Sequence, residues 1–558
     1  MFASKETGRS RLEYDSVILD EKMIKKTVLA VLSLMVFGGS LAAPAYSALA
    51  NARSPGLQAR SVEGVLDLRP EEVDLATAAL IISERWSQTV YGLRCHSELD
   101  AMATEIQDRL RAKRLKADYR AIPVINEYLF DELGFEAVSE ADDPNDLFLH
   151  TVLAKRKGYC LSLSVLYLSI GERLGLPVHG VVVPGHFFAR YDDKRIRFNI
   201  ETVAGGASPT DAHYVQKYKV PKGDRYSIYM KNLDKIQTLG CFFNNLGIVY
   251  SEIGNDDSSL ETLLLAVEIN PVLSESRSSL GNAYLRKGHI NEAVYQYEKA
   301  LEINPNDPKT HNNLGNAYTE RGWTNYAVSQ YLAAIQLDPK LADAHKNLAR
   351  AYVSQKRYSQ AISQLKNLLA VAPDDADCYS QIGYVYQHMD KCAQAVTYYT
   401  KALGMNPDLI AASCGLAACY NTLGQVEDEI KTYEGILARD PEMLLALVNL
   451  GNAYFQQEKY DQALAYYLRA AEVQPDDASI LYNIGAAYFN RRMYQQANTA
   501  YEEAIAIDPK LADAHYGLAV GLYNLGQFEK AWKHVNIAKE LGAKVTQQQL
   551  DAIKSRLR

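Results

Sequence analysis

The sequence is poor in cysteine and has no excess of basic residues. Seven cysteines in 558 residues are too few for a disulfide scaffold, and the odd number leaves at least one thiol unpaired. Lysine and arginine number 59 against 67 aspartates and glutamates, so the formal charge is −8. This balance lacks the cationic surface that binding to a phosphate backbone needs. We therefore predict that nucleic acid is not a partner.

Metal and cofactor signatures are also missing. The chain has no glycine-rich phosphate-binding loop, and its cysteines show neither Cys-x-x-Cys nor His-paired spacing. We expect neither a metal site nor a cofactor. Six thiols are interpreted as residues that pack between helices: Cys95, Cys241, Cys378, Cys392, Cys414 and Cys419.

Long apolar runs are missing after residue 50, but one precedes it. In residues 23–50 two lysines are followed by an apolar run and by small residues with Ala-x-Ala sites at Ala43–Ala45 and Ala48–Ala50. This order is typical of a secretory signal peptide. We interpret residues 1–22 as an extra leader before a true start at Met23. The protein is then exported, to the periplasm or the extracellular space, with no stable membrane insertion after cleavage. An uncleaved membrane anchor is the alternative, because a run of about 17 apolar residues can just span a bilayer.

Tyrosine is abundant, with 38 residues against 13 Phe and 3 Trp, because part of the chain repeats. Over residues 240–545 an aliphatic-Gly/Ala pair recurs every 34 residues, beginning at Leu246-Gly247, and in eight of the nine units a tyrosine follows the aliphatic residue by four. Eight prolines recur at the same interval, from Pro271 to Pro509, and end the first eight units. Small residues let two helices approach closely, so each unit is predicted to be a helix pair. This pattern resembles the tetratricopeptide repeat family, in nine units, and implies an all-α superhelix (an α-solenoid) whose concave face binds protein segments.

Two further features belong to the repeats. Residues 546–558 are predicted to form a polar capping helix with Leu550, Ile553 and Leu557 on its inner side. Asparagines recur at positions that face the concave side in the family, and a column of amides could hold an extended peptide partner by its backbone. The alternative is that they are solvated or bind the local backbone. The column consists of Asn245, Asn282, Asn313, Asn316, Asn347, Asn449, Asn452 and Asn483.

A mixed α+β segment lies between the signal and the repeats. Apolar periodicity predicts helices at 70–88, 98–115, 122–133 and 146–157, and another from Cys160 to Leu174. A strand is predicted at 178–183, followed by a hairpin whose strands, 186–191 and 195–202, flank a turn at 192–194.

Cys160 is the candidate nucleophile of this segment. The first turn of a helix favours a thiolate, because unpaired N–H groups and the helix dipole attract negative charge. His186 begins one hairpin strand, while Asn199 and Glu201 lie on one face of the other. The order is that of a nucleophile, a base and a group that orients the base. Register alone does not choose between Asn199 and Glu201, and His179 competes with His186 as the base.

Residues 65–235 resemble the transglutaminase-like superfamily, in the bacterial branch where this core precedes tetratricopeptide repeats. The resemblance implies a papain-like triad with Cys160 as nucleophile, His186 as general base and acid, and Glu201 as the orienting group. The family usually has Asp at this last place, so Asn199 stays open as a substitute. The motifs that carry it are Gly158-Tyr159-Cys160, Gly175-Leu176-Pro177, Pro184-Gly185-His186-Phe187 and Asn199-Ile200-Glu201.

Two functions follow from these features. In the first, the protein is an exported cysteine-dependent amide hydrolase or acyl transferase whose repeats dock a protein substrate. In the second, the core is inert and the chain is an interaction scaffold. The intact Cys160, His186 and acid set favours the first.

Overall fold

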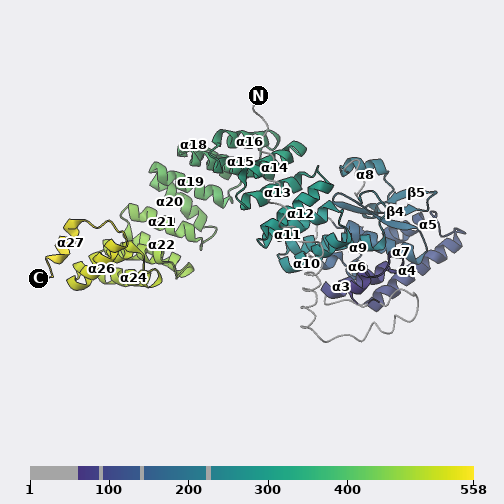
Figure 1. Cartoon of the computed structure of the whole chain (residues 1–558), viewed down its shortest axis with the longest axis horizontal. Coiled ribbons are helices and arrows are strands. Elements are labelled where there is room, and N and C mark those ends of the chain that lie inside the picture. The colour runs from purple at the N-terminus through teal and green to yellow at the C-terminus, as the bar shows by residue number, and fades with distance from the viewer. Residues whose placement is uncertain (1–58, 60, 87–91, 139–143, 221–227, 558) are drawn as a thin grey trace, which may run out of the picture. The chain divides into compact units, whose positions relative to one another are not determined.

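The structure of the chain, a computed structural model, describes residues 59, 61–86, 92–138, 144–220 and 228–557 (Figure 1). Of these, the residues up to Val220 together with Ile228–Ile253 form one compact unit, and those from Gly254 onward form a second. The predicted leader and signal peptide, residues 1–50, lie outside the described residues. In the described parts of the chain, no helix is long and apolar enough to cross a membrane.

Helices form most of the first unit. Around α7 (Cys160–Arg173) the buried residues run without interruption from Leu161 to Gly171, because helices cover it on one side and a sheet on the other. The other elements before the sheet are α2 (Val62–Leu66), η3 (Pro70–Glu72), α3 (Leu75–Trp86), α4 (Gly92–Ala112), α5 (Ala121–Asn126), η4 (Glu127–Glu132), η5 (Pro144–Leu147) and α6 (Leu149–Lys155).

The sheet of this unit is antiparallel and has the strand order β3-β4-β5. Its strands are β3 (Val178–Val183), β4 (His186–Asp192) and β5 (Arg197–Ile200), followed by η6 (Thr202–Ala204) and α8 (Asp211–Lys217). The β4–β5 turn is longer than the predicted 192–194, because Asp192 pairs with Arg197. A short parallel pair that the sequence did not indicate, β1 (Glu136–Ala137) with β2 (Lys157–Gly158), lies directly before α7.

The helix α9 (Lys235–Glu252) opens the first predicted repeat but belongs to the first unit. Its Phe242 and Phe243 are buried, with ring centroids 5.9 Å from Phe148 and 5.9 Å from Trp86 respectively. Lys235 pairs with Glu172 at the end of α7. Aromatic packing therefore incorporates the first repeat helix into the core that precedes it.

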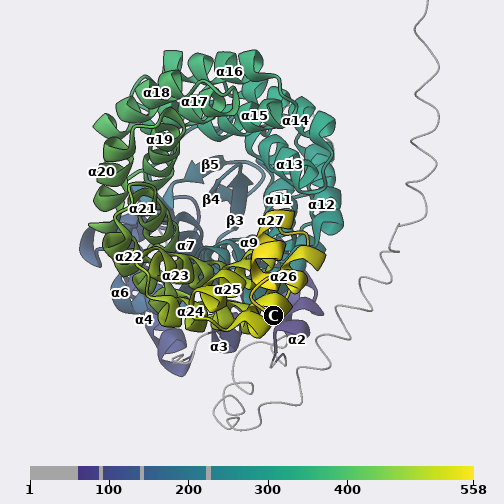
Figure 2. The same ribbon diagram turned by 90° about the vertical axis from the view of Figure 1, so that its left-hand side faces the viewer.

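The second unit is a series of helix pairs, as the 34-residue period predicts. Figure 2 shows them winding into a ring with the first helix of each pair on the inner side. After α10 (Asp256–Ile269) the pairs are α11 (Ser274–Arg286) and α12 (Ile290–Ile303), α13 (Pro308–Glu320) and α14 (Thr324–Leu337), α15 (Ala342–Ser354) and α16 (Tyr358–Val371), α17 (Ala376–His388) and α18 (Cys392–Met405), α19 (Ile410–Leu423) and α20 (Val426–Leu437), α21 (Leu444–Gln456) and α22 (Tyr460–Val473), α23 (Ala478–Asn490) and α24 (Tyr494–Ile507), and α25 (Ala512–Asn524) and α26 (Phe528–Glu540).

The unit ends in α27 (Gln547–Lys554), at the place predicted for the capping helix. Leu550 and Ile553 are buried as expected. The expectation for Leu557 was wrong, since this residue lies beyond the last turn of α27 and is exposed.

A glycine of the first helix and a tyrosine of the second hold most pairs together. A Cβ on Gly451 would lie 2.5 Å from Cε1 of the buried Tyr467, so only glycine lets the ring in. The same relation links Gly281 with Tyr297, Gly315 with Tyr331, Gly383 with Tyr399 and Gly485 with Tyr501. In three pairs alanine replaces the glycine. In two of them the tyrosine is also replaced by a smaller residue, as in Ala349 with Leu365 and Ala519 with Val535. The third pair, Ala417 with Tyr433, keeps the tyrosine.

We expect Gly451→Ala to lower the free energy of unfolding of the second unit by about 1–3 kcal/mol, because the new methyl overpacks the Tyr467 ring. Gly435→Ala is the matched control. Nothing lies within 4 Å of its Cβ position, so the helix gains roughly 0.5–1 kcal/mol. Urea titrations followed by circular dichroism measure both effects. Adding Tyr467→Leu to Gly451→Ala reproduces the Ala349 and Leu365 arrangement and should restore stability; a Gly451→Ala variant as stable as Gly435→Ala would contradict the packing argument.

Candidate active site

Cys160 is the first residue of α7, and a glycine makes its position possible. Gly158 brings β2 so close to α7 that a Cβ there would lie 2.8 Å from Ser162 Oγ. The same Ser162 Oγ accepts the backbone N–H of Tyr159 at 2.8 Å and so closes the helix start. Cys160 is half-buried, whereas five of the other six thiols are buried. The thiol therefore lies at a helix N-terminus, where a negative charge is favoured.

His186, the first residue of β4, connects Cys160 with Glu201. Its Nε2 donates to Glu201 Oε2 at 2.8 Å, which leaves Nδ1 for Cys160, the other group that interacts with the imidazole. Burial opposes the charged imidazolium, but the hydrogen bonds and charges of Cys160 and Glu201 outweigh it and raise the pKa of His186 to about 9. The structure thus brings Cys160, His186 and Glu201 together in the predicted order.

Glu201 reaches His186 along a diagonal of the sheet. Ala189 pairs with Ile200, so residue 201 would follow opposite Phe188, two residues from His186. The extra methylene of glutamate relative to aspartate covers this offset. Burial acts to raise the pKa of Glu201. The hydrogen bonds from His186, Tyr214 and the Val203 backbone have the larger effect, so the pKa of Glu201 is lowered.

Asn199 is not the orienting group. It pairs with Arg190, four residues from His186, which is about 13 Å along a strand. Its Oδ1 accepts Arg190 Nε at 2.7 Å, and its Nδ2 donates to Asp211 Oδ1 at 2.8 Å and to the Pro209 carbonyl at 2.9 Å. The hypothesis that Asn199 substitutes for the acid is therefore wrong. The four-residue turn sets this register, which the sequence left open.

His179 is not the base. It lies in β3 opposite Arg190, whereas Val183 is the β3 residue opposite His186. The four intervening residues of β3 again correspond to about 13 Å. Burial lowers the pKa of His179, the opposite direction from His186.

Residues that the sequence did not point to complete the site. Tyr214 donates to Glu201 Oε2 at 2.8 Å, and the ring of Tyr218 stacks on His186 with centroids 4.8 Å apart and planes 3° from parallel. Both tyrosines follow Thr210, whose side chain caps α8. The cap signal Thr210-Asp211 followed by two tyrosines four apart was the available clue, but nothing in it indicates contact with His186.

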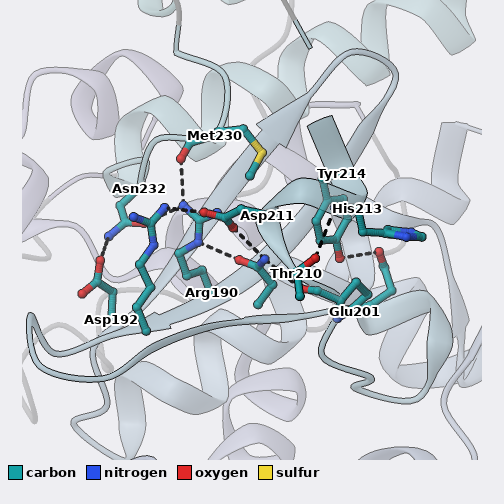
Figure 3. A network of polar contacts seen from close by, with 12 residues as sticks. Arg190, Asp192, Glu201, Thr210, Asp211, His213, Tyr214, Met230 and Asn232 are labelled. Atoms are coloured by element: carbon teal, nitrogen blue, oxygen red, sulfur yellow. Dashed lines mark hydrogen bonds and ion pairs between the residues drawn. The ribbon is translucent and has the colours of Figure 1, made fainter. Parts of the chain in front are cut away.

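A fully buried arginine anchors the start of α8. Arg190 Nη2 donates to Asp211 Oδ1 at 2.8 Å and its Nη1 to the Met230 carbonyl at 2.8 Å (Figure 3). With the Arg190–Asn199 bond, these contacts join β4, β5, α8 and the segment around residue 230. On the other side Thr202, next to Glu201, shares a 2.9 Å hydrogen bond with Ser164 of α7. The acid is thus tied to the helix that carries Cys160.

The predicted asparagine column is partly engaged within the protein. Tyr297 and Tyr331 donate to Oδ1 of Asn282 and Asn316, at 2.6 and 2.9 Å, and the next repeats add Asn313 Nδ2 to Asn282 and Asn347 Nδ2 to Asn316, both at 2.9 Å. Asn452 accepts from Tyr467 at 2.7 Å. Asn483 is half-buried, and Asn245 lies in α9, in the first unit. These amides are exposed or half-buried, so the peptide-binding prediction for them stays a prediction.

Within the described residues, no group of three His, Cys, Asp or Glu side chains could hold a metal ion.

Both units of the chain match known protein families. A family profile described as the transglutaminase-like superfamily matches residues 94–239, and profiles of the tetratricopeptide repeat match segments of residues 281–409 and 451–511. The chain joins a transglutaminase-like domain to tetratricopeptide repeats.

Curated proteins match part of the chain. A UPF0162 protein of Xylella fastidiosa is 27% identical over 227 residues, which is 38% of this chain and 78% of that protein. A UPF0162 protein of Pseudomonas aeruginosa is 25% identical over 39% of this chain and 80% of that protein. The F-box only protein 21 of Mus musculus is 36% identical over 74 residues, which is 13% of this chain and 12% of that protein.

Solved structures of tetratricopeptide repeat proteins match part of the chain. A tetratricopeptide repeat protein of Parabacteroides merdae covers 45% of this chain and 98% of its own, with 17% identity and a TM-score of 0.34. A thermophilic repeat protein of Thermus thermophilus covers 32% and 98%, with 22% identity and a TM-score of 0.29.

Proposed function

We propose that the transglutaminase-like domain is a cysteine-dependent amide hydrolase or acyl transferase with Cys160, His186 and Glu201 as its triad. The Cys160 thiolate attacks the carbonyl carbon of a carboxamide or peptide bond. His186 gives its Nδ1 proton to the leaving nitrogen, and a thioester remains. Water or an amine then attacks the thioester and gives a proton to His186, and the Cys160 thiolate is released.

The observation that carries the proposal is the His186 imidazole, which bonds Glu201 through Nε2 at 2.8 Å and interacts with Cys160 on its other side. A raised imidazole pKa of about 9 keeps His186 charged at neutral pH, and a neighbouring imidazolium favours a thiolate. Glu201, with its lowered pKa, is the ionised partner that the imidazolium needs. A buried cysteine that only fills space needs neither of these partners.

The remaining parts of the chain fit a protein substrate. Tetratricopeptide repeats mediate protein–protein interactions, and the asparagines on the first helices offer amide groups to a peptide backbone. We place such a partner, as substrate or regulator, on the second unit. Residues 23–50 would direct the protein out of the cytoplasm, which a fractionation experiment with a tagged full-length chain tests.

At pH 6 we expect iodoacetamide to modify Cys160 about 100-fold faster than any other thiol of the chain. Burial raises the pKa of Cys95 and Cys414, and raises that of Cys378 and Cys419 to about 12. Cys414 is the matched control, because it is half-buried like Cys160 but its pKa is raised by burial. Mass spectrometry of the labelled peptides measures the rates in one sample.

Equal rates for Cys160 and Cys414 in the folded protein would contradict the proposal and leave an inert domain attached to an interaction scaffold. Where the rates differ, the substrate can be sought next. A thiol-directed acyl probe followed by mass spectrometry should trap an adduct on Cys160, and Cys160→Ala should abolish it.

A further inference from the structure

Tyr214 contacts the proposed triad at its acidic end. Its hydroxyl donates to Glu201 Oε2, the same oxygen that accepts His186 Nε2, and both bonds are 2.8 Å long. Tyr214 is only 1% exposed. In Figure 3 the hydroxyl of Tyr214 and the carboxylate of Glu201 point toward one another.

Glu201 needs a second donor because of where it lies. It follows the last residue of β5 and reaches His186 on a diagonal, and glutamate has one more rotatable bond than aspartate. It is also buried, its Oε1 accepts only the Val203 N–H at 3.4 Å among the described residues, and the bonds to Oε2 therefore supply most of the compensation that water would provide. A second hydrogen bond selects the conformer that meets the imidazole and stabilises the charged form.

The position of the Tyr214 ring is itself determined by packing. Its centroid lies 3.9 Å from that of Phe188 with planes 11° from parallel, and α8, which carries it, begins at Asp211, the partner of Arg190. The hydroxyl therefore cannot follow Glu201 into other conformers without disturbing this stack.

We propose that Tyr214 is a positioning residue of the triad, which holds the Glu201 carboxylate against His186. The role rests on the proposed function of Cys160, His186 and Glu201. Tyr214 transfers no proton and contacts no substrate in this role, and it acts only through Glu201.

The test is Tyr214→Phe, which keeps the ring and removes the donor. We expect the rate of Cys160 alkylation at pH 6 to fall roughly tenfold and the rate at pH 10, above the ordinary pKa range of cysteine thiols, to stay unchanged. Tyr191→Phe is the matched control: it removes a hydroxyl that donates to Asp193 at 3.1 Å from an equally buried tyrosine in β4 of the same unit. A purely structural role would lower stability in both variants and leave the pH profile unchanged.

A second measurement separates this inference from the proposed function. The ring signal of His186, assigned by its loss in His186→Gln, is titrated by NMR in the wild type and in Tyr214→Phe, and its midpoint should fall by about one pH unit in the variant. If wild-type Cys160 is not selectively alkylated but the midpoint still falls, the enzyme fails and the role of Tyr214 stands. An unchanged midpoint, or a rise that shows the hydroxyl competing with His186 for Oε2, overturns it.

Discussion

Replacing Glu201 with glutamine is expected to lower the pKa of His186 by at least two units and to slow Cys160 alkylation at pH 6 about a hundredfold. The amide has no charge to offer the imidazolium. Burial lowers the pKa of His186, and only the interaction with Cys160 then remains to raise it. The pKa of His186 then lies at about 7 or lower, so the imidazolium loses its proton at a lower pH than in the wild type. The thiolate loses its cation when this happens.

Glu98→Gln is the control for this variant. Glu98 accepts Arg156 Nη2 at 2.9 Å in the same domain, so this substitution also removes one acid from an ion pair. It should leave the pH profile of Cys160 unchanged. If Glu201→Gln also gave the wild-type profile, Glu201 would not support the charge of His186, and the triad would reduce to Cys160 and His186.

Much of the repeat architecture could be predicted from the sequence because its signal is periodic and local. A 34-residue interval places glycines, tyrosines and prolines at fixed points of each helix pair, and the structure has helix pairs at those points. What the period could not show is where α9 packs. Phe242 and Phe243 pack against Phe148 and Trp86, which lie far away in the sequence. No position of the repeat pattern indicates these contacts.

The candidate site was predictable in its residues but not in its geometry. A helix start at Cys160 and a strand start at His186 are local features of the sequence. The choice between Asn199 and Glu201 depended on the length of one turn, since a change of two residues in register moves a side chain along the strand by about 7 Å. Tyr214 could not have been found, because helix α8 is brought to the sheet by Arg190, in the middle of an otherwise apolar strand.

Arg190 is therefore the residue whose loss should cost the first unit most. We expect Arg190→Met to lower the free energy of unfolding of this unit by about 3–5 kcal/mol. The guanidinium is fully buried, and its removal leaves the buried Oδ1 of Asn199 without this donor and Asp211 without its short ion pair. Methionine replaces much of the volume, so the loss measures the polar contacts more than a cavity.

Arg197→Met is the matched control, because Arg197 binds the other oxygen of Asp211 at 3.2 Å from an exposed position. Exposed ion pairs contribute little, so this variant should lose no more than about 1 kcal/mol. Trp86 of α3 reports on the first unit in urea titrations when Trp323 and Trp532, the other two tryptophans, are replaced with phenylalanine in every variant.

The same pair of variants links stability to the site. Arg190 fixes the start of α8, which carries Tyr214 and ends next to Tyr218, so Arg190→Met should also slow Cys160 alkylation at pH 6 under conditions where the unit is still folded. Arg197→Met leaves the buried Arg190 contact with Asp211 in place and should not. Equal stability of the two variants would mean that the buried guanidinium is balanced by its own desolvation, and the anchoring of α8 would then have to come from the stack of Tyr214 on Phe188.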